Sequence, residues 1–176
     1  MTQAAAVDSR LAHVVLDGEA LTRLSPILEA DRAQAVADLT VENKFRPLTL
    51  KPGQESCRQF ALHLSIQEGR LVFDIRCFDS ARGDDESGEG APVSAILLAL
   101  GPFRGLIKDY QLLVDSHIKA VEEGREARIQ AIDMGRRGLH DEGAALMCQR
   151  LDGKIAIDFA TARRLFTLVC VLHTRG

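Results

Sequence analysis

The stretch CRQFALHLSIQEGRLVFDIRCF, Cys57 to Phe78, contains two consecutive segments in which apolar and polar residues alternate. The apolar face of the first is Phe60, Leu62, Leu64 and Ile66, and that of the second is Leu71, Phe73, Ile75 and Cys77. A period of two is typical of half-buried strands. If Glu68 and Gly69 form a two-residue turn, both apolar faces coincide. The stretch therefore predicts a β-hairpin in which His63 lies opposite Asp74.

Further strands are predicted on both sides of this hairpin. LAHVVLD, residues 11–17, alternates well enough for a strand, and VSAILLAL, residues 93–100, reads as a third consecutive strand of the meander. KIAID, residues 154–158, predicts a short strand near the C-terminus. The Pro and Gly content of residues 44–55 indicates a connection, and the acidic, glycine-rich residues 80–92 predict a mobile loop because they have nothing to bury.

Helices account for most of the remaining chain. In SPILEADRAQAVADLTVEN, residues 25–43, Ser25 is a candidate N-cap and Asn43 can close the helix. Pro102 opens a long helix with apolar residues at three-and-four spacing, which ends at Gly124, and another helix starts near Glu126. The last segment, residues 159–173, is apolar nearly all round, which predicts a helix in the middle of the core. Its expected N-cap is Asp158.

These elements predict an α+β fold, an antiparallel β meander packed against several helices, with a mainly helical C-terminal half. At 176 residues, with 46% hydrophobic and 27% charged residues, the chain has the size and composition of one soluble globular domain. We expect a flexible tail over residues 1–10 and a single globular domain over 11–176. The net charge of −3 disfavours a nucleic-acid partner. No signal peptide or membrane-spanning segment is recognised, so we expect a cytoplasmic protein without a membrane partner.

The cysteines and histidines do not form a metal-ligand pattern. Cys57, Cys77, Cys148 and Cys170 occur singly, without a CxxC motif, and we expect buried, reduced thiols. The five histidines are His13, His63, His117, His140 and His173. They do not pair at helical ligand spacing, so we predict neither a metal site nor a cofactor.

The segment IDMGRRGLHDEGA, residues 132–144, predicts a corner between two helices. A first helix ending at Arg137 would place Gly138 at the left-handed position beyond the cap, and Asp141 would cap the next helix. Gly135 and Gly143 then lie inside helices, where each costs roughly 0.5 to 1 kcal/mol relative to alanine. We expect something to approach closely there, either another helix or a ligand.

Arginines gather in this segment and in the last predicted helix. Arg163 and Arg164 lie in the early turns of that helix, where the helix dipole disfavours cations, so at least one should have an acidic or anionic partner. We expect arginines of both segments to approach one another around a shared carboxylate or bound anion, because unscreened guanidinium groups repel. The predicted ligand-binding set for a phosphate or carboxylate group is Arg136, Arg137, His140, Arg163 and Arg164.

Four segments of the chain are similar to a known family. RLVFDIR, PFRGLIKDY, QAIDMGRRGLHDEG and DFATARRLFTLVCVLH resemble a family of uncharacterised alphaproteobacterial proteins of the UPF series, number zero-two-six-two. The resemblance runs from about Leu62 to the C-terminus and is most specific in the last fifty residues. It implies a bacterial cytoplasmic protein, and it implies no activity, substrate or cofactor.

Three functions are compatible with these patterns. The first is a small cytoplasmic binding or interaction module whose arginine-rich site takes a phosphorylated small molecule or a protein partner. The second is a homo-oligomeric or partner-binding structural protein, for example a homodimer, without a ligand site. The third is a hydrolase-type enzyme that uses His63 and Asp74, although such a cross-strand pair is more often structural. No nucleophile elbow, phosphate-binding loop or HExxH motif supports catalysis, so we favour a non-enzymatic protein.

Overall fold

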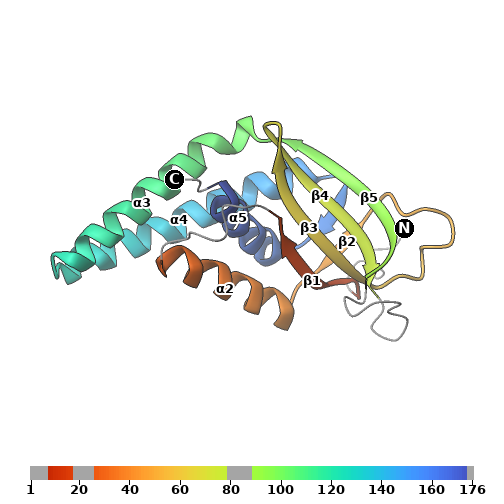
Figure 1. The fold of residues 1–176 in the computed structure, drawn as a ribbon, viewed down its shortest axis with the longest axis horizontal. Coiled ribbons are helices and arrows are strands. Elements are labelled where there is room, and N and C mark those ends of the chain that lie inside the picture. The colour runs from red at the N-terminus through yellow and green to blue at the C-terminus, as the bar shows by residue number, and fades with distance from the viewer. Residues whose placement is uncertain (1–7, 18–25, 79–88, 174–176) are drawn as a thin grey trace.

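The computed structural model describes residues 8–17, 26–78 and 89–173, and it has an α+β fold (Figure 1). The strands are β1 (Arg10–Leu16), β2 (Phe45–Pro47), β3 (Gln59–Gln67), β4 (Arg70–Phe78), β5 (Glu89–Ala99) and β6 (Ile155–Ile157). The helices are α2 (Pro26–Val41), the 3-10 turn η2 (Gly101–Phe103), α3 (Arg104–Glu122), α4 (Glu126–Leu151) and α5 (Phe159–His173). The C-terminal half is mainly helical, as predicted.

The predicted hairpin is confirmed residue by residue. Glu68 and Gly69 both have positive φ, 52° and 73°, which suits a two-residue turn that follows the twist of the strands. Leu64 pairs with Phe73 and His63 pairs with Asp74 in the antiparallel β3–β4 ladder. The two-residue turn and the apolar alternation predict the same register, and the structure has that register.

The sheet has the strand order β1-β3-β4-β5 and is mainly antiparallel. It departs from a purely antiparallel meander at β1, which pairs with β3 in parallel. The chain passes through α2 and β2 between these strands, and such a crossover returns it to the same end of the sheet. The predicted short strand β6 is confirmed; its partner is β2, which lies in the segment predicted to be a connection. Three residues are too few to show a periodic pattern.

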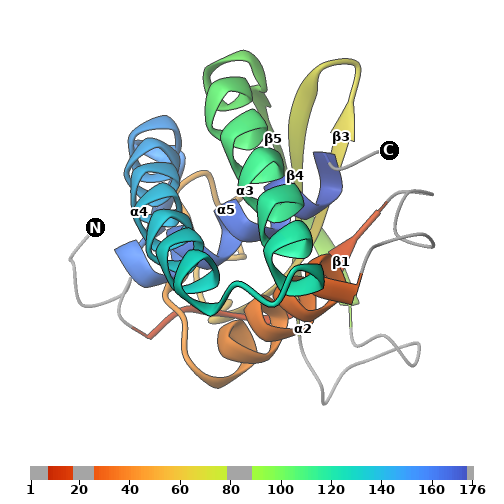
Figure 2. The same ribbon diagram turned by 90° about the vertical axis from the view of Figure 1, so that its left-hand side faces the viewer.

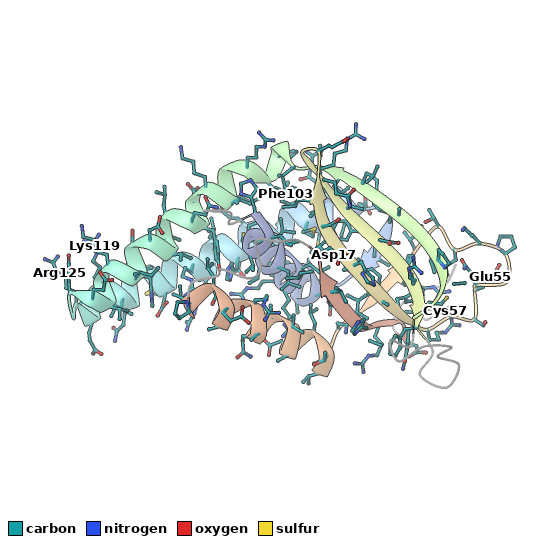
Figure 3. The ribbon with its side chains drawn as sticks, viewed as in Figure 1. Asp17, Glu55, Cys57, Phe103, Lys119 and Arg125 are labelled. Atoms are coloured by element: carbon teal, nitrogen blue, oxygen red, sulfur yellow. The ribbon has the colours of Figure 1, made fainter. Side chains whose placement is uncertain are left out.

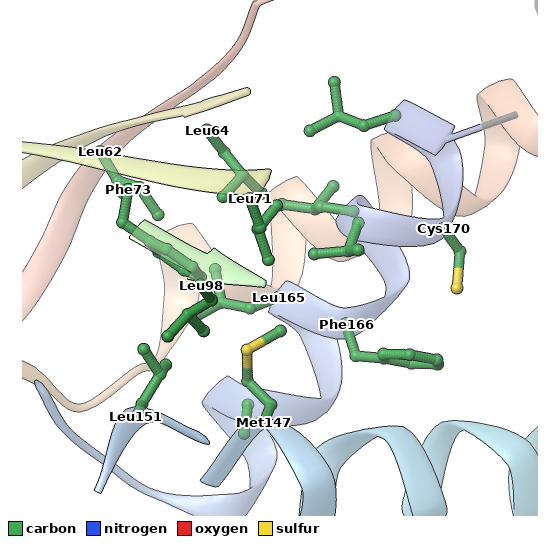
Figure 4. Packing of buried hydrophobic residues seen from close by; sticks show 14 of the residues in the cluster. Leu62, Leu64, Leu71, Phe73, Leu98, Met147, Leu151, Leu165, Phe166 and Cys170 are labelled. Atoms are coloured by element: carbon green, nitrogen blue, oxygen red, sulfur yellow. The ribbon is translucent and has the colours of Figure 1, made fainter. Parts of the chain in front are cut away.

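Helix α5 lies in the middle of the core, as predicted. Leu165, Phe166 and Cys170 of α5 are fully buried; Leu165 points towards the leucines of the sheet and Met147 of α4, and Phe166 and Cys170 lie on the other side of the helix (Figure 4). Its N-cap is also as predicted, because the Asp158 Oδ1 accepts a hydrogen bond from the Thr161 backbone N–H at 2.9 Å.

Asn43 closes α2 and ties it to the first strand. Its Nδ2 donates to the carbonyls of Leu39, at 2.6 Å, and Leu11, at 2.8 Å, while its Oδ1 accepts from the Leu11 N–H. One buried amide side chain thus provides hydrogen-bond partners for backbone groups at the C-terminal end of α2 and in β1. The predicted cap at Ser25, residues 1–7 of the tail and residues 80–88 of the acidic loop lie outside the described residues.

The predicted helix break near Gly138 is wrong. Helix α4 runs unbroken from Glu126 to Leu151, through Gly138 and through the expected cap at Asp141. It packs along α3 on one side and α5 on the other (Figure 2), and it buries Leu139 and Met147. These contacts outweigh the cost of its glycines, about 1 kcal/mol each relative to alanine.

The expectation for the cysteines holds only in part. Within the described residues none of the four cysteines forms a disulfide, and Cys170 alone is buried. Cys57, Cys77 and Cys148 are partly exposed, because they lie at the margin of the core rather than inside it.

Candidate functional site

Arg136, the first residue of the predicted anion site, is held by carboxylates of the protein. Its side chain is only 14% exposed and bonds Asp31 of α2, with a second contact to the Asp133 Oδ1 at 3.4 Å. The Tyr110 hydroxyl of α3 donates to the same Asp31 oxygen at 2.5 Å. Burial opposes the positive charge, but the Asp31 carboxylate outweighs it and the pKa of Arg136 is raised. Burial and Asp31 likewise raise the pKa of Tyr110.

His140 lies one turn further along α4 and is almost fully buried. Its ring stacks on Tyr110, with centroids 5.6 Å apart, and meets Phe166 edge-on at 6.4 Å. Burial, and then the charges of Arg163 and Arg136, lower the pKa of His140 to about 4. The ring is therefore neutral at pH 7 and brings no positive charge to an anion. Its Nε2 is buried and has no hydrogen-bond partner in the described part of the chain.

The remaining predicted arginines have separate partners. Arg163 Nε lies 3.1 Å from the Asp141 Oδ1, and Arg164 Nε lies 3.9 Å from the Asp38 Oδ2. Within the described part of the chain, Arg136, Arg163 and Arg164 thus form ion pairs with different carboxylates rather than around one shared acidic group. Because α4 does not break, Arg136 and Arg137 project about 100° apart, and Arg137 is exposed.

The His63 pair has an additional member that the sequence did not predict. Asp74 lies opposite His63 in the ladder, and the Asp17 Oδ2 lies 3.5 Å from the His63 Nδ1. Asp17 directly follows β1, and it reaches His63 because β1 runs parallel to β3. The Asp17 carboxylate can orient the His63 imidazole, which is compatible with either a structural or a catalytic role.

A groove runs along the outer side of the helical hairpin formed by α3 and α4. It encloses about 450 Å³, and its lining is Asp109, Leu112, Leu113, Ser116, Gly135, Gly138, Leu139 and Glu142. Leu112 of this lining is 55% exposed. Gly135 and Gly138 form part of one wall, so a neighbouring molecule could approach the α4 backbone closely there.

The groove belongs to a longer surface, which we call the hairpin face. Helical spacing of three and four places its members on one side of each helix. They are Asp109, Leu112, Ser116 and Lys119 of α3, and Arg128, Ala131, Gly135, Gly138 and Glu142 of α4. Every member except the half-buried Ser116 is exposed. A continuous face cannot be recognised from the sequence when α4 is divided at Gly138, as the predicted corner divides it.

Charge is separated along the hairpin face. Asp109 and Glu142 lie in the groove, towards the end of the hairpin nearer the sheet. Lys119 and Arg128 lie further out, and Figure 3 places Lys119 close to the tip beside Arg125. Ser116 and Gly135 lie between the acidic and the basic ends. Among these members the acidic side chains lie towards the sheet and the basic ones towards the tip, where the exposed Glu123 also forms an ion pair with Arg125.

The described residues contain neither a metal cluster nor a membrane span. No group of three or more histidine, cysteine or acidic side chains there could hold a metal ion. In that same part of the chain, no helix has the length and apolar character needed to cross a membrane.

Comparison with known proteins identifies a family. Residues 8–175 match the Uncharacterised protein family (UPF0262). A UPF0262 protein of Granulibacter bethesdensis is 64% identical over 97% of this chain and 93% of its own length. One of Acidiphilium cryptum is 55% identical over 98% of both chains. One of Bradyrhizobium diazoefficiens is 45% identical over 96% of this chain and 94% of its own.

The chain therefore belongs to the UPF0262 family. The resemblance noted in the sequence is confirmed, and the match also covers the N-terminal part of the chain from residue 8. No solved structure matches the chain.

Proposed function

We propose that this member of the UPF0262 family is a homo-oligomeric interaction module, whose hairpin face pairs with the same face of a second copy. The observation that carries the proposal is the separation of charge along that face, with Asp109 and Glu142 at one end and Lys119 and Arg128 at the other. When a second copy of such a surface is rotated by 180°, the charges of the two copies are complementary. Isologous pairing of one patch with itself is the commonest form of oligomer.

The arrangement that satisfies these charges is antiparallel. A two-fold axis near Ser116 and Gly135 sets the acidic end of each copy against the basic end of the other. In a parallel arrangement like charges would face each other, which disfavours that pairing. The two hairpins together then form a four-helix bundle, with packing like that of other helix bundles.

Burial of the central residues adds to the association. Leu112 is 55% exposed in the single chain, and transfer of such a side chain out of water contributes favourably at roughly 25 cal/mol per Å² of apolar surface. A Cβ placed on Gly138 would meet no atom of the described residues within 4 Å, so this side of α4 is open to a neighbouring helix. Large side chains here would keep the two backbones apart.

Paired charge reversal tests this proposal. Asp109→Lys with Glu142→Lys makes the whole face basic, and Lys119→Glu with Arg128→Glu makes it acidic. We expect each double variant to be monomeric in light scattering after size exclusion, at concentrations where the wild type is a dimer. An equimolar mixture of the two variants should recover a dimer, because opposite charges then meet at both ends.

A matched control carries the same charge change elsewhere, at Glu42→Lys with Asp152→Lys, both exposed and outside the hairpin face. This control should remain dimeric. A wild-type protein that is monomeric at every accessible concentration, or a variant mixture that stays monomeric beside a dimeric wild type, contradicts the proposal.

Anion binding and catalysis are less well supported. Arg136, Arg163 and Arg164 each lie near a carboxylate, and among the described residues that line the groove there is no arginine. An arginine-bound phosphate stays a prediction, to be tested by thermal scans of the wild type and Arg137→Ala with a panel of anions.

A further inference from the structure

The sheet ends at β5, an edge strand that pairs only with β4 among the described strands (Figure 1). An edge strand presents unpaired backbone N–H and C=O groups, to which another strand can add. The features that protect such edges are confined to the beginning of β5. Pro92 and the shifts in the β4–β5 register lie there, and the Gln54 side chain donates to the Pro92 carbonyl at 3.0 Å. Residues 93–99 contain neither a proline nor a charged side chain.

The hydrogen-bonding pattern determines which backbone groups of β5 point away from the sheet. The Leu100 N–H donates to the Gly69 carbonyl at 3.2 Å, so the backbone of Leu100 faces the β3–β4 hairpin. Along an antiparallel strand this direction alternates from residue to residue. The N–H and C=O groups of Ala95, Leu97 and Ala99 therefore point outwards. Within the described part of the chain, no hydrogen bond reaches them.

The outward side chains of this part of β5 are apolar. Successive residues of a strand point to opposite faces of the sheet, so Ile96 and Leu98 are buried in the core, while Leu97 between them is 51% exposed. In the β4–β5 ladder Leu97 lies beside Val72, which is half-buried. These two side chains form an apolar row that ends at the open edge.

We infer that β5 pairs antiparallel with β5 of a second copy, about a two-fold axis at Leu97. In this register Leu97 lies opposite Leu97 of the second copy, and Ala95 lies opposite its Ala99. All three outward-facing residues then exchange backbone hydrogen bonds with the other copy. The apolar row of Val72 and Leu97 continues across the axis, and the two sheets become one. Such pairing of an edge with itself is isologous.

Charge favours the same register. Asp74 lies beside Ala95, and Arg70 lies beside Ala99, on the same face of the sheet. In the paired sheet, Asp74 of each copy shares a row with Arg70 of the other, with two alanines between them. Their Cα atoms are three strand spacings apart, about 14 Å. The small alanines leave room for the exposed arginine to extend towards the carboxylate, so opposite charges are complementary in both outer rows.

This contact uses no residue of the hairpin face. A strand ladder over residues 95–99 buries less surface than a stable dimer interface needs, so a single contact forms only transiently. Two copies already joined through the hairpin face, as proposed above, present two β5 edges, and two contacts acting together hold more firmly than one. Only this strengthening rests on the proposed function.

Disulfide trapping in the full chain tests the register. Leu97→Cys places two thiols across the axis, with Cα atoms about 5.5 Å apart, which suits a disulfide. Under mild oxidation it should give a cross-linked dimer at least about tenfold faster than Val72→Cys, whose symmetry mates lie about 14 Å apart. Peptide mapping confirms a link between the two substituted positions. The same difference should appear when Asp109→Lys and Glu142→Lys disrupt the hairpin face.

Two further changes, made in the Leu97→Cys chain, test the charges and the backbone. Asp74→Arg sets like charges in both outer rows and should slow cross-linking about tenfold, and adding Arg70→Asp should restore the rate. Ala95→Pro removes one outward N–H without removing a hydrogen bond to β4, and it should also slow cross-linking. Circular dichroism checks that each variant is folded. If Asp74→Arg does not fold, Ala95→Pro and the Val72→Cys control decide the question.

Equal rates for Leu97→Cys and Val72→Cys would overturn the inference, and so would a rate that neither the charge changes nor the proline alters. Failure here is distinguishable from failure of the proposed function. A wild type that is dimeric in light scattering, without preferential cross-linking at position 97, sinks the β5 contact alone. A wild type that is monomeric, but whose Leu97→Cys variant cross-links as expected, contradicts the hairpin-face dimer alone.

Discussion

Gly143 marks the tightest contact between α4 and α5. A Cβ at this position would lie 2.2 Å from the Phe166 ring, well inside van der Waals contact, and Phe166 is fully buried. We predict that Gly143→Ala lowers the free energy of unfolding by about 1 to 3 kcal/mol, the usual cost of overpacking a core. Urea denaturation measures the change. A neutral or stabilising effect would mean that Phe166 moves aside without cost.

His140 makes stability depend on pH. Its pKa is about 4 in the fold, against an ordinary value of 6.5, so the unfolded chain takes up the proton first as the pH falls. Stability should be fully present above about pH 6.5 and decrease down to about pH 4. The total loss should be on the order of 3 kcal/mol, at about 1.4 kcal/mol per pKa unit.

The variant His140→Gln isolates this contribution. It lacks the titrating ring, so its free energy of unfolding should depend less on pH between 6.5 and 4 than that of the wild type. Urea unfolding at intervals of half a pH unit provides the comparison. Equal slopes in the two proteins would assign the pH dependence to other groups.

At the scale of the element, α4 contains glycines with unequal roles. Within the described part of the chain, nothing lies within 4 Å of a Cβ position at Gly138, and α4 is helical on both sides of it. Gly138→Ala should therefore stabilise the single chain by about 0.5 to 1 kcal/mol, the gain in helix propensity. Urea unfolding of a dilute, monomeric sample checks this, with Gly143→Ala as the variant expected to have the opposite effect. Destabilisation by Gly138→Ala would indicate strain in α4 at that position.

For the whole molecule, self-association links stability to concentration. If two copies pair through the hairpin face, the melting temperature of the wild type should rise with protein concentration, because dimerisation stabilises only the folded chain. The Asp109→Lys and Glu142→Lys variant should melt at a temperature that does not depend on concentration. Calorimetry over a hundredfold dilution measures both. A wild type whose melting temperature does not change with dilution would speak against the dimer.

The sequence alone determined the features that depend on neighbouring residues. The β3–β4 register follows from the turn at Glu68 and Gly69 and from the alternation beside it, and both act over a few residues. The Asp158 cap and the buried position of α5 also follow from local pattern, since a helix that is apolar nearly all round has no stable place at a surface. The sequence likewise predicts a close approach at Gly143, by either another helix or a ligand, and in the structure Phe166 of α5 lies there.

Tertiary structure alone decided the rest. Glycine costs a helix only about 1 kcal/mol, and burial of residues such as Leu139 against neighbouring elements exceeds that, so α4 continues where its local pattern predicts a break. The parallel pairing of β1 and the β2–β6 pair join residues far apart in the chain. The partners of Arg136 and Arg163 depend on which helices pack together, and so does the hairpin face. These choices rest on long-range contacts, which no short window of the sequence contains.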